Sequence, residues 1–154
     1  MKLATIEFAR NVAGLSKANS EEIDTKSKDL VIHLMESQKL LISQKRFGGT
    51  IRLGAYPCLL AKNTLIKRLY GQSKISERHR HRYEFNNHYR PVLASKGLVI
   101  SGLSPDGNLV EAIELSPTKH PFFLGTQFHP EFKSRPLDPH PIFIGFIKAC
   151  LKAA

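Results

Sequence analysis

The residues most able to do chemistry lie together in one short string, QFHPE at 127–131. The apolar run before it, 122–128, is typical of a buried strand, so His129 is expected just past the strand's end, in a cleft at the edge of a sheet. Glu131 can accept a hydrogen bond from one imidazole nitrogen and leave the other free to take a proton from a nucleophile. The pair would supply two thirds of a catalytic triad, although a loop histidine with a structural hydrogen bond has the same pattern.

A triad of this kind needs a nucleophile, and the sequence contains only two cysteines, Cys58 and Cys150. They lie far apart, form no CxxC motif, and suggest neither a zinc site nor a disulfide framework. Cys58 falls in a predicted strand and Cys150 in the last predicted helix, where each is better explained as a small hydrophobic residue than as a reactive thiol. We therefore predict no metal site and no nucleophilic cysteine in this chain.

The elements that must position the string follow from the spacing of apolar residues. The first third of the chain predicts a helix over 3–13, a polar stretch over 16–29, a strand over 30–35 and a polar loop over 37–49. The helix over 3–13 has no Ser, Thr, Asp or Asn before it to cap its amides, which is unusual for the start of a natural domain.

The rest of the chain alternates predicted strands and helices. Pro105-Asp106-Gly107 is a strong turn signal and predicts a hairpin. Helices on both sides of an apolar strand indicate an α/β fold. The predicted elements are a strand over 50–60, a helix from its cap Asn63 to Leu69, an extended segment over 76–85, a helix over 86–95, strands over 98–101 and 109–115, and a helix over 142–152.

The chain is basic: 23 Lys and Arg residues against 13 Asp and Glu residues give a net charge of +10. Its densest basic run is RHRHR at 78–82, and in an extended strand the arginines face one way and the histidines the other. Such a charge favours polyanions, because each neutralised phosphate releases counterions. The other positive charges are scattered, however, so we expect a solvated basic surface and no nucleic-acid partner.

Length and composition exclude several classes of protein. The 154 residues correspond to about one domain, and 42% hydrophobic residues are enough to bury a core, so the chain is not wholly disordered. No apolar run approaches the roughly 18 residues that a membrane span requires, and Glu7 and Arg10 lie where a signal peptide would be apolar. We expect a cytoplasmic protein with no membrane partner.

The string QFHPE resembles the signature of class I glutamine amidotransferases, in which the histidine and glutamate join a cysteine to hydrolyse glutamine. Longer strings narrow the resemblance to the CTP synthase family. The resemblance runs in order through nearly the whole chain, and ERHRHRYE is far more specific than QFHPE. The strings are IEFARNV at 6–12, ANS at 18–20, GGTIRLGAYPC at 48–58, ERHRHRYEFNN at 77–87, SPDG at 104–107 and HPEFKSRP at 129–136.

The resemblance implies that 1–154 form part of a class I glutamine amidotransferase domain. This is an α/β fold with a flavodoxin-like mixed sheet and flanking helices, here expected without its N-terminal strands and nucleophile elbow. In the family, Met1 would fall inside the elbow motif, shortly after the catalytic cysteine. Lys2 stands where the family has a glutamine that contacts the substrate.

The resemblance also assigns site residues. His129 and Glu131 would be catalytic. Glu22 would hold the amino group of L-glutamine, and Arg82 would lie near its carboxylate. Both assignments are chemically sensible, because a carboxylate pairs with an ammonium group and a guanidinium can form two hydrogen bonds to a carboxylate. From the residues alone, Glu22 could equally be a solvated loop acid.

No nucleotide site is visible in the sequence. The string GGT at 48–50 lacks the spacing of a phosphate-binding loop. We expect no cofactor in this chain, and the resemblance places ATP and magnesium in the family's missing synthetase domain. Arg78 and Arg80 are expected to pair with Glu77 or Glu84, or to face another domain, rather than to contact a nucleotide.

By resemblance, the family hydrolyses glutamine and uses the ammonia for ATP-dependent amination of UTP to CTP in pyrimidine biosynthesis, as a homo-oligomeric ligase. This chain alone is expected to be inactive, because the nucleophile and the oxyanion donors are absent. Two alternatives stay open. One is half of a split glutaminase, complemented in trans by a cysteine-bearing or synthetase polypeptide. The other is a basic module that binds nucleic acid on the same scaffold, although the sequence lacks the interleaved aromatic residues of single-strand binders.

Overall fold

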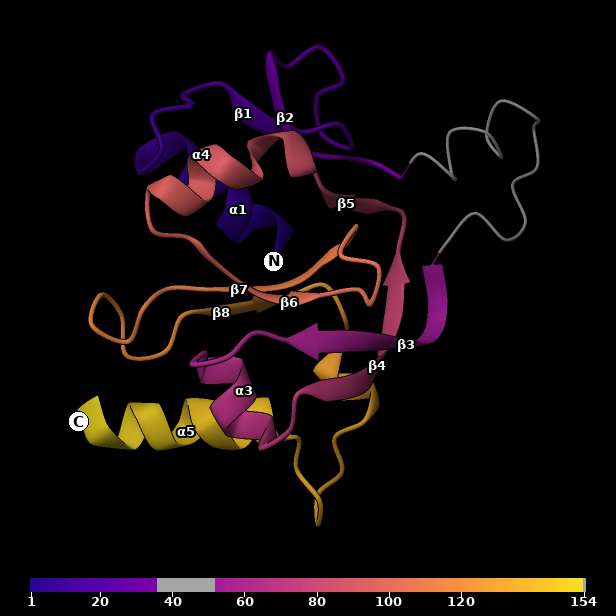
Figure 1. The fold of residues 1–154 in the computed structure, drawn as a ribbon, viewed down its shortest axis with the longest axis vertical. Helices are drawn as coiled ribbons and strands as arrows, with labels where there is room; N and C mark the ends of the chain where they lie inside the picture. The colour runs from indigo at the N-terminus through magenta and orange to yellow at the C-terminus, as the bar shows by residue number, and fades with distance from the viewer. Residues whose placement is uncertain (36–51, 154) are drawn as a thin grey trace.

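Two β-sheets and the helices packed on them make up the computed structural model, which describes residues 1–35 and 52–153 (Figure 1). The smaller sheet has the strand order β1-β2-β5 and the larger has the order β4-β3-β6-β7-β8. The predicted α/β class is confirmed. Among the described residues, no helix is both long and apolar enough to cross a membrane.

The smaller sheet is mixed and carries the first helix. Strands β1 and β2 pair in parallel, whereas β2 and β5 are antiparallel. The first helix has no side-chain cap, as its sequence suggests, and it buries Ile6, Phe8 and Ala9. The elements are α1 (Lys2–Asn11), β1 (Ala18–Ser20), β2 (Asp29–Leu34) and β5 (Tyr83–Phe85).

The larger sheet begins with a long antiparallel pair, β3 (Arg52–Leu60) and β4 (Lys74–His81), joined through α3 (Leu65–Tyr70). The helix cap is Thr64, whose side chain accepts from the Lys67 amide, and not the predicted Asn63. Asn63 instead takes a left-handed conformation with φ 61°, which asparagine tolerates, in the turn between β3 and α3. The strand predicted over 50–60 is observed from residue 52, and its first two residues lie outside the described part.

The extended segment predicted over 76–85 is two strands in two different sheets. The chain bends at Arg82, so that β4 lies at one edge of the larger sheet and β5 joins the smaller one. The strand predicted over 122–128 is regular only in β8 (Leu124–Thr126). The predicted helix over 86–95 is a 3₁₀ turn, η1 (Asn87–Tyr89), followed by α4 (Arg90–Ser95).

The predicted hairpin is confirmed. Strands β6 (Val99–Leu103) and β7 (Val110–Glu114) pair antiparallel, and Gly107 takes the positive φ of 74° that the turn requires. The Ser104 hydroxyl donates to Asp106, and the Asn108 amide donates to the same carboxylate. These bonds hold the pKa of Asp106 below its ordinary value, the Ser104 bond being the largest cause.

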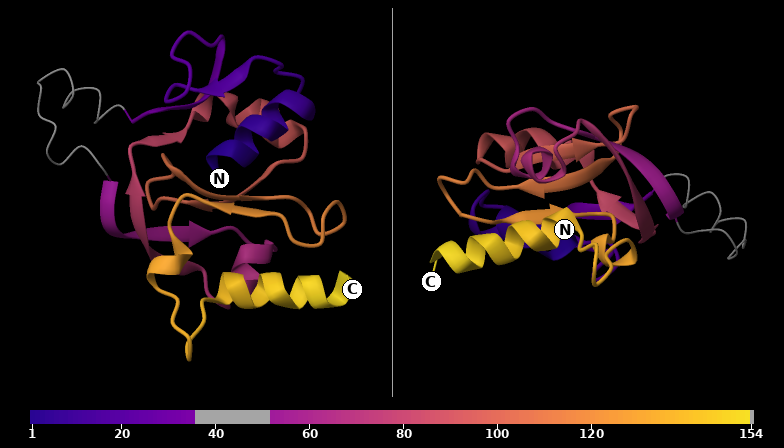
Figure 2. Two further views of the ribbon diagram at one scale, coloured as in Figure 1. Left: turned by 180° about the vertical axis from the view of Figure 1, so that it is seen from behind. Right: turned by 90° about the horizontal axis from the view of Figure 1, so that it is seen from below.

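Two apolar clusters lie on opposite faces of the larger sheet. One joins the sheet to α1 and α4, and the other joins it to α3 and α5 (Pro141–Ala153). Figure 2 shows the last helix lying on the outside of the molecule, away from α1. Gly102 allows β6 to pack closely, because a Cβ there would lie 2.9 Å from Cys58 Sγ.

Candidate active site

The histidine and glutamate of the QFHPE string form a hydrogen-bonded pair. His129 Nδ1 lies 2.6 Å from Glu131 Oε1, and the His129 amide donates to the Arg78 carbonyl at 2.9 Å. A short 3₁₀ turn, η2 (Pro130–Phe132), brings Glu131 back to the imidazole, and the Phe132 ring stacks on it with centroids 5.0 Å apart. Because Nδ1–H donates to the carboxylate, Nε2 is left as the basic nitrogen. The predicted orientation by Glu131 is therefore present in the structure.

The electrostatics of the pair favour an ionised carboxylate. Partial burial raises the pKa of Glu131, but the hydrogen bond from His129 and the charges of His129 and His140 outweigh it and hold that pKa below its ordinary value. The His129 side chain is 36% exposed and that of Glu131 56%, so packing alone does not fix them. Their position depends on how the surrounding loop is held.

The loop after the pair is held against the edge of β4 by a cluster around Glu77. The Lys133 ammonium donates to the Ser76 carbonyl at 2.7 Å. Glu77 is 2% exposed, and its Oε1 lies 3.2 Å from His140 Nε2 and accepts from the Tyr70 hydroxyl at 3.0 Å. His140 Nδ1 accepts from the Ile142 amide, so its Nε2 carries the proton and faces Glu77. The 129–140 segment is thus tied to three consecutive residues of β4.

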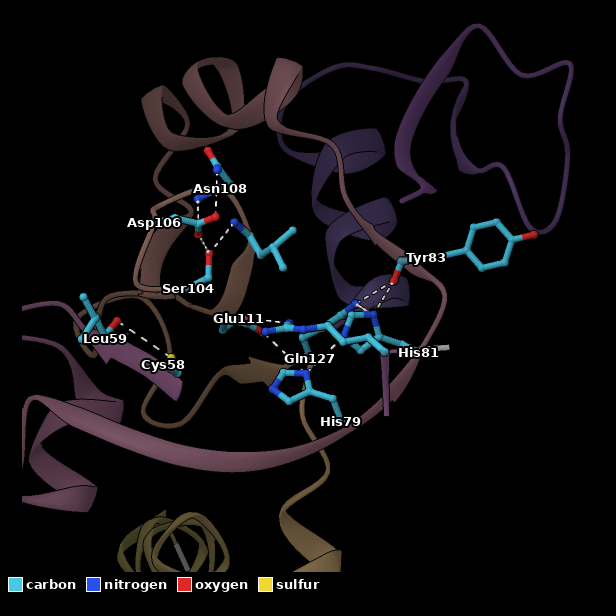
Figure 3. A network of polar contacts seen from close by, with 12 residues as sticks. Cys58, Leu59, His79, His81, Tyr83, Ser104, Asp106, Asn108, Glu111 and Gln127 are labelled. Atoms are coloured by element: carbon cyan, nitrogen blue, oxygen red, sulfur yellow. Dashed lines mark hydrogen bonds and ion pairs between the residues drawn. The ribbon is translucent and has the colours of Figure 1, made fainter. Parts of the chain in front are cut away.

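A second polar network joins Gln127 to His81 and His79 of β4 (Figure 3). The Gln127 side-chain amide lies 2.9 Å from His81 Nδ1 and donates to the Tyr83 carbonyl at 2.7 Å. His81 Nε2 lies 3.1 Å from His79 Nδ1. Burial is the main reason that the pKa of His79 is lowered to about 3 and that of His81 to about 4. Both rings are therefore neutral at pH 7, which suits a hydrogen-bonded chain in the interior.

The network ends at a buried ion pair between β3 and β7. Arg52 Nη1 lies 2.6 Å from Glu111 Oε1, and Glu111 is fully buried. Burial raises the pKa of Glu111, whereas the Arg52 charge lowers it. The Glu111 carbonyl also accepts from the Gln127 amide at 2.8 Å, so the same residue holds the chain just before His129.

A cavity of about 390 Å³ opens beside His129. Its size suits a small polar molecule, and the basic Nε2 of His129 belongs to a side chain in its wall. The arrangement can therefore remove a proton from a group bound there. The residues that line the cavity are Met1, Lys2, Leu3, Arg80, His81, Thr126, Gln127 and His129.

The two residues assigned to glutamine, Glu22 and Arg82, are not among the described residues that line this cavity. Glu22, in the turn after β1, receives a hydrogen bond from Lys2 Nζ at 2.9 Å, and Lys2 lines the cavity. Arg82 is exposed at the bend between β4 and β5, and its carbonyl accepts from the Met35 amide at 3.2 Å. The structure thus joins Glu22 to one residue of the cavity wall, Lys2, and does not bring Arg82 into that wall.

Neither cysteine is suited to serve the dyad. Cys58 is fully buried, and burial is the main cause that raises the pKa of its thiol to about 12. Cys150 is exposed near the end of α5, and no residue of this helix is among the described residues that line the cavity beside His129.

Sequence reasoning missed the residues that support the site. Of the partners expected for Arg78 and Arg80, Glu77 is not one, because alternate residues of β4 face opposite ways and Glu77 points inward to His140 while both arginines are exposed. The predicted alternation of arginines and histidines is observed, but the sequence did not show that the histidine face, with His79 and His81, is the buried one. The partner His140 comes from a distant loop, so no local pattern reveals it.

Comparison with known proteins agrees with the geometry. The family model described as "Glutamine amidotransferase class-I" matches residues 1–149. CTP synthase of Thermobifida fusca is 57% identical over 154 residues, which is 99% of this chain and 28% of that protein. CTP synthase of Rubrobacter xylanophilus is 58% identical over 100% of this chain and 27% of its own length. The chain thus spans about a quarter of the length of these curated relatives.

A solved structure gives the same result. The Trypanosoma brucei CTPS glutaminase domain with bound acivicin has a TM-score of 0.87 and 37% identity, over 99% of this chain and 57% of that one. This similarity confirms the expected fold, part of a glutaminase domain with mixed sheets and flanking helices. The match to the family model extends over nearly all of the sequence. The chain belongs to the class I glutamine amidotransferase family and, within it, is similar to the CTP synthases.

Proposed function

We propose that residues 1–154 form part of the glutaminase domain of a CTP synthase, with His129 as the general base and Glu131 as the carboxylate that orients it. The observation that carries the proposal is the 2.6 Å contact between His129 Nδ1 and Glu131 Oε1, next to a cavity that His129 lines. The ammonia released would serve the amination of UTP to CTP. The proposal assigns ATP and magnesium to the synthetase part of the relatives, outside this chain.

In glutamine hydrolysis, a thiolate attacks the carboxamide carbon and the amide nitrogen leaves as ammonia after receiving a proton. Water then attacks the thioester and releases glutamate and the thiol. In this proposal His129 Nε2, whose lone pair is free, would take the thiol proton, pass it to the leaving nitrogen, and later deprotonate the water. Glu131 keeps the imidazole in the tautomer that these steps require.

We also propose that this chain, when isolated, does not hydrolyse glutamine. The sequence has only two cysteines, one buried in the sheet and one on α5, so no thiol faces His129. Without the nucleophile, the base has no thiol proton to remove.

The test is ammonia release from L-glutamine by the purified chain, measured with a coupled glutamate dehydrogenase assay. We expect none above the buffer blank, with added ammonium chloride as the positive control of the assay. Hydrolysis that is lost in the His129→Ala variant would contradict the expected inactivity, because the chain would then supply a nucleophile of its own, while it would still support His129 as the base.

One observation favours completion of the site by further polypeptide. The last helix exposes several large apolar side chains that a finished domain would cover. Such an apolar face is a surface on which further polypeptide, carried by the same chain or, as in a split enzyme, by another, would pack. The exposed residues are Phe143, Ile144, Phe146, Ile147 and Leu151.

A further inference from the structure

We infer that Lys2 determines specificity in the proposed glutamine site: its ammonium group occupies the Glu22 carboxylate and so closes it to the α-ammonium group of an amino acid. This inference rests on the proposed function. It concerns a residue in which this chain departs from the glutamine of the family pattern.

Two contacts hold the Lys2 ammonium in place. Its Nζ lies 2.9 Å from Glu22 Oε2 and 5.2 Å from the centroid of the Tyr83 ring. A carboxylate and the face of an aromatic ring are the partners that an amino acid's own ammonium group would seek. Lys2 therefore takes up both interactions before any substrate arrives.

The position of Lys2 in its helix gives a further reason for the contact with Glu22. Lys2 is the first residue of α1, and a positive charge in the first turn opposes the helix dipole. The pairing with Glu22 offsets this repulsion and gives the side chain a reason to stay in its observed position. Its exposure, 31% for Lys2 and 51% for Glu22, shows that solvent can still reach the pair, so a ligand can compete for it.

The charges around the cavity point to the same conclusion. Lys2 lines the cavity, whereas Glu22 does not, so the contact with Lys2 is what connects the Glu22 carboxylate to the cavity. Arg80 is the other fully charged side chain among the described lining residues, and none of those residues is acidic. The cavity thus offers cations to a carboxylate and no free anion to an ammonium group.

Two ligands that differ only in the α-amino group can show whether Lys2 fills the ammonium position. Glutaramate, the monoamide of glutaric acid, is glutamine without its α-amino group. If Lys2 fills the ammonium position, the α-amino group of glutamine contributes nothing to binding by the wild-type chain. Removing the charge of Lys2 should then allow the α-amino group of glutamine to contribute to binding.

The experiment is an NMR titration of the full chain with L-glutamine and with glutaramate, following the amides of Thr126 and His129. The wild type should bind glutaramate at least as tightly as L-glutamine. In Lys2→Gln and Lys2→Met, the Kd for L-glutamine should fall about tenfold, while the Kd for glutaramate does not fall. Lys62→Gln, which removes an exposed lysine outside the cavity, should behave as wild type.

The other possible results of the titration would contradict either the role of Lys2 or the proposed glutamine site. An unchanged Kd for L-glutamine in both Lys2 variants would overturn this inference alone, as would an equal fall for both ligands, which would indicate steric blocking. Absence of binding by either ligand to any variant with a native amide spectrum would instead overturn the proposed glutamine site, and this inference with it.

Discussion

The imidazole of His129 is oriented by one carboxylate and one ring, and both are supplied by the next three residues of the chain. Glu131 lies 2.6 Å away and Phe132 stacks on the imidazole. Such short-range support can be predicted from a string of five letters. The buried residues that hold the string, such as His81, cannot be predicted in this way, because His81 lies 46 residues before its partner Gln127.

Among these buried residues, His79 and His81 predict how stability depends on pH. Their pKa values, about 3 and about 4 in the folded chain, lie below the ordinary 6.5 because both rings are buried. Between those values and 6.5 the unfolded chain binds more protons, so stability is fully present above about pH 6.5 and falls as the pH is lowered. We expect the free energy of unfolding to drop by about 2 to 3 kcal/mol from pH 7.0 to 5.5.

Urea unfolding of the wild type and of His79→Gln at both pH values tests this expectation. The variant should lose only about half as much stability between the two pH values, because one of the two titrating rings is gone. An equal loss in both proteins would show that other groups control the pH dependence.

At the scale of elements, the strand β4 organises the site. Its inward face carries Glu77, His79 and His81, and its free edge receives the 129–140 loop through backbone carbonyls. The apolar and polar alternation predicts the existence of this strand but not its end. The chain leaves the larger sheet at Arg82, and that bend depends on the smaller sheet, whose pairing partner β2 lies about fifty residues earlier.

The Glu77 cluster predicts how firmly the loop is held. His140→Ala removes the 3.2 Å contact with Glu77 and the acceptor of the Ile142 amide. We expect hydrogen exchange of the His129 amide, which donates to the Arg78 carbonyl, to become at least about tenfold faster, because the loop opens locally.

Amides of β2, in the other sheet, should change little in the same NMR exchange experiment. His88→Ala is the matched control, because this exposed histidine makes no contact with the loop among the described residues. A uniform acceleration throughout the molecule would show a loss of global stability instead of a role in holding the loop.

For the whole molecule, the fold and the family could be predicted from the sequence, because long strings such as ERHRHRYE are specific. The contacts that are proposed to set ligand specificity could not be predicted from the sequence. The position of Lys2 over Glu22 and Tyr83 requires the first helix and both sheets to be assembled. The same holds for the exposed apolar face of α5, since amphipathic spacing does not show which face remains uncovered.

In the proposed glutaminase, His129 is the working base and Glu131 the carboxylate that orients it. A hybrid enzyme, in which residues 1–154 replace the matching segment of the Thermobifida fusca CTP synthase, tests both roles. The measurement is CTP formation from UTP and ATP with L-glutamine as the nitrogen source. Formation with added ammonia serves as the control of folding.

We expect the hybrid to use glutamine, and His129→Ala to lower the glutamine-dependent rate by about a hundredfold or more while the ammonia-dependent rate is unchanged. Glu131→Gln should act in the same direction, because the imidazole loses the carboxylate that orients it. A hybrid that makes CTP from ammonia but whose use of glutamine is unaffected by His129→Ala would contradict the account.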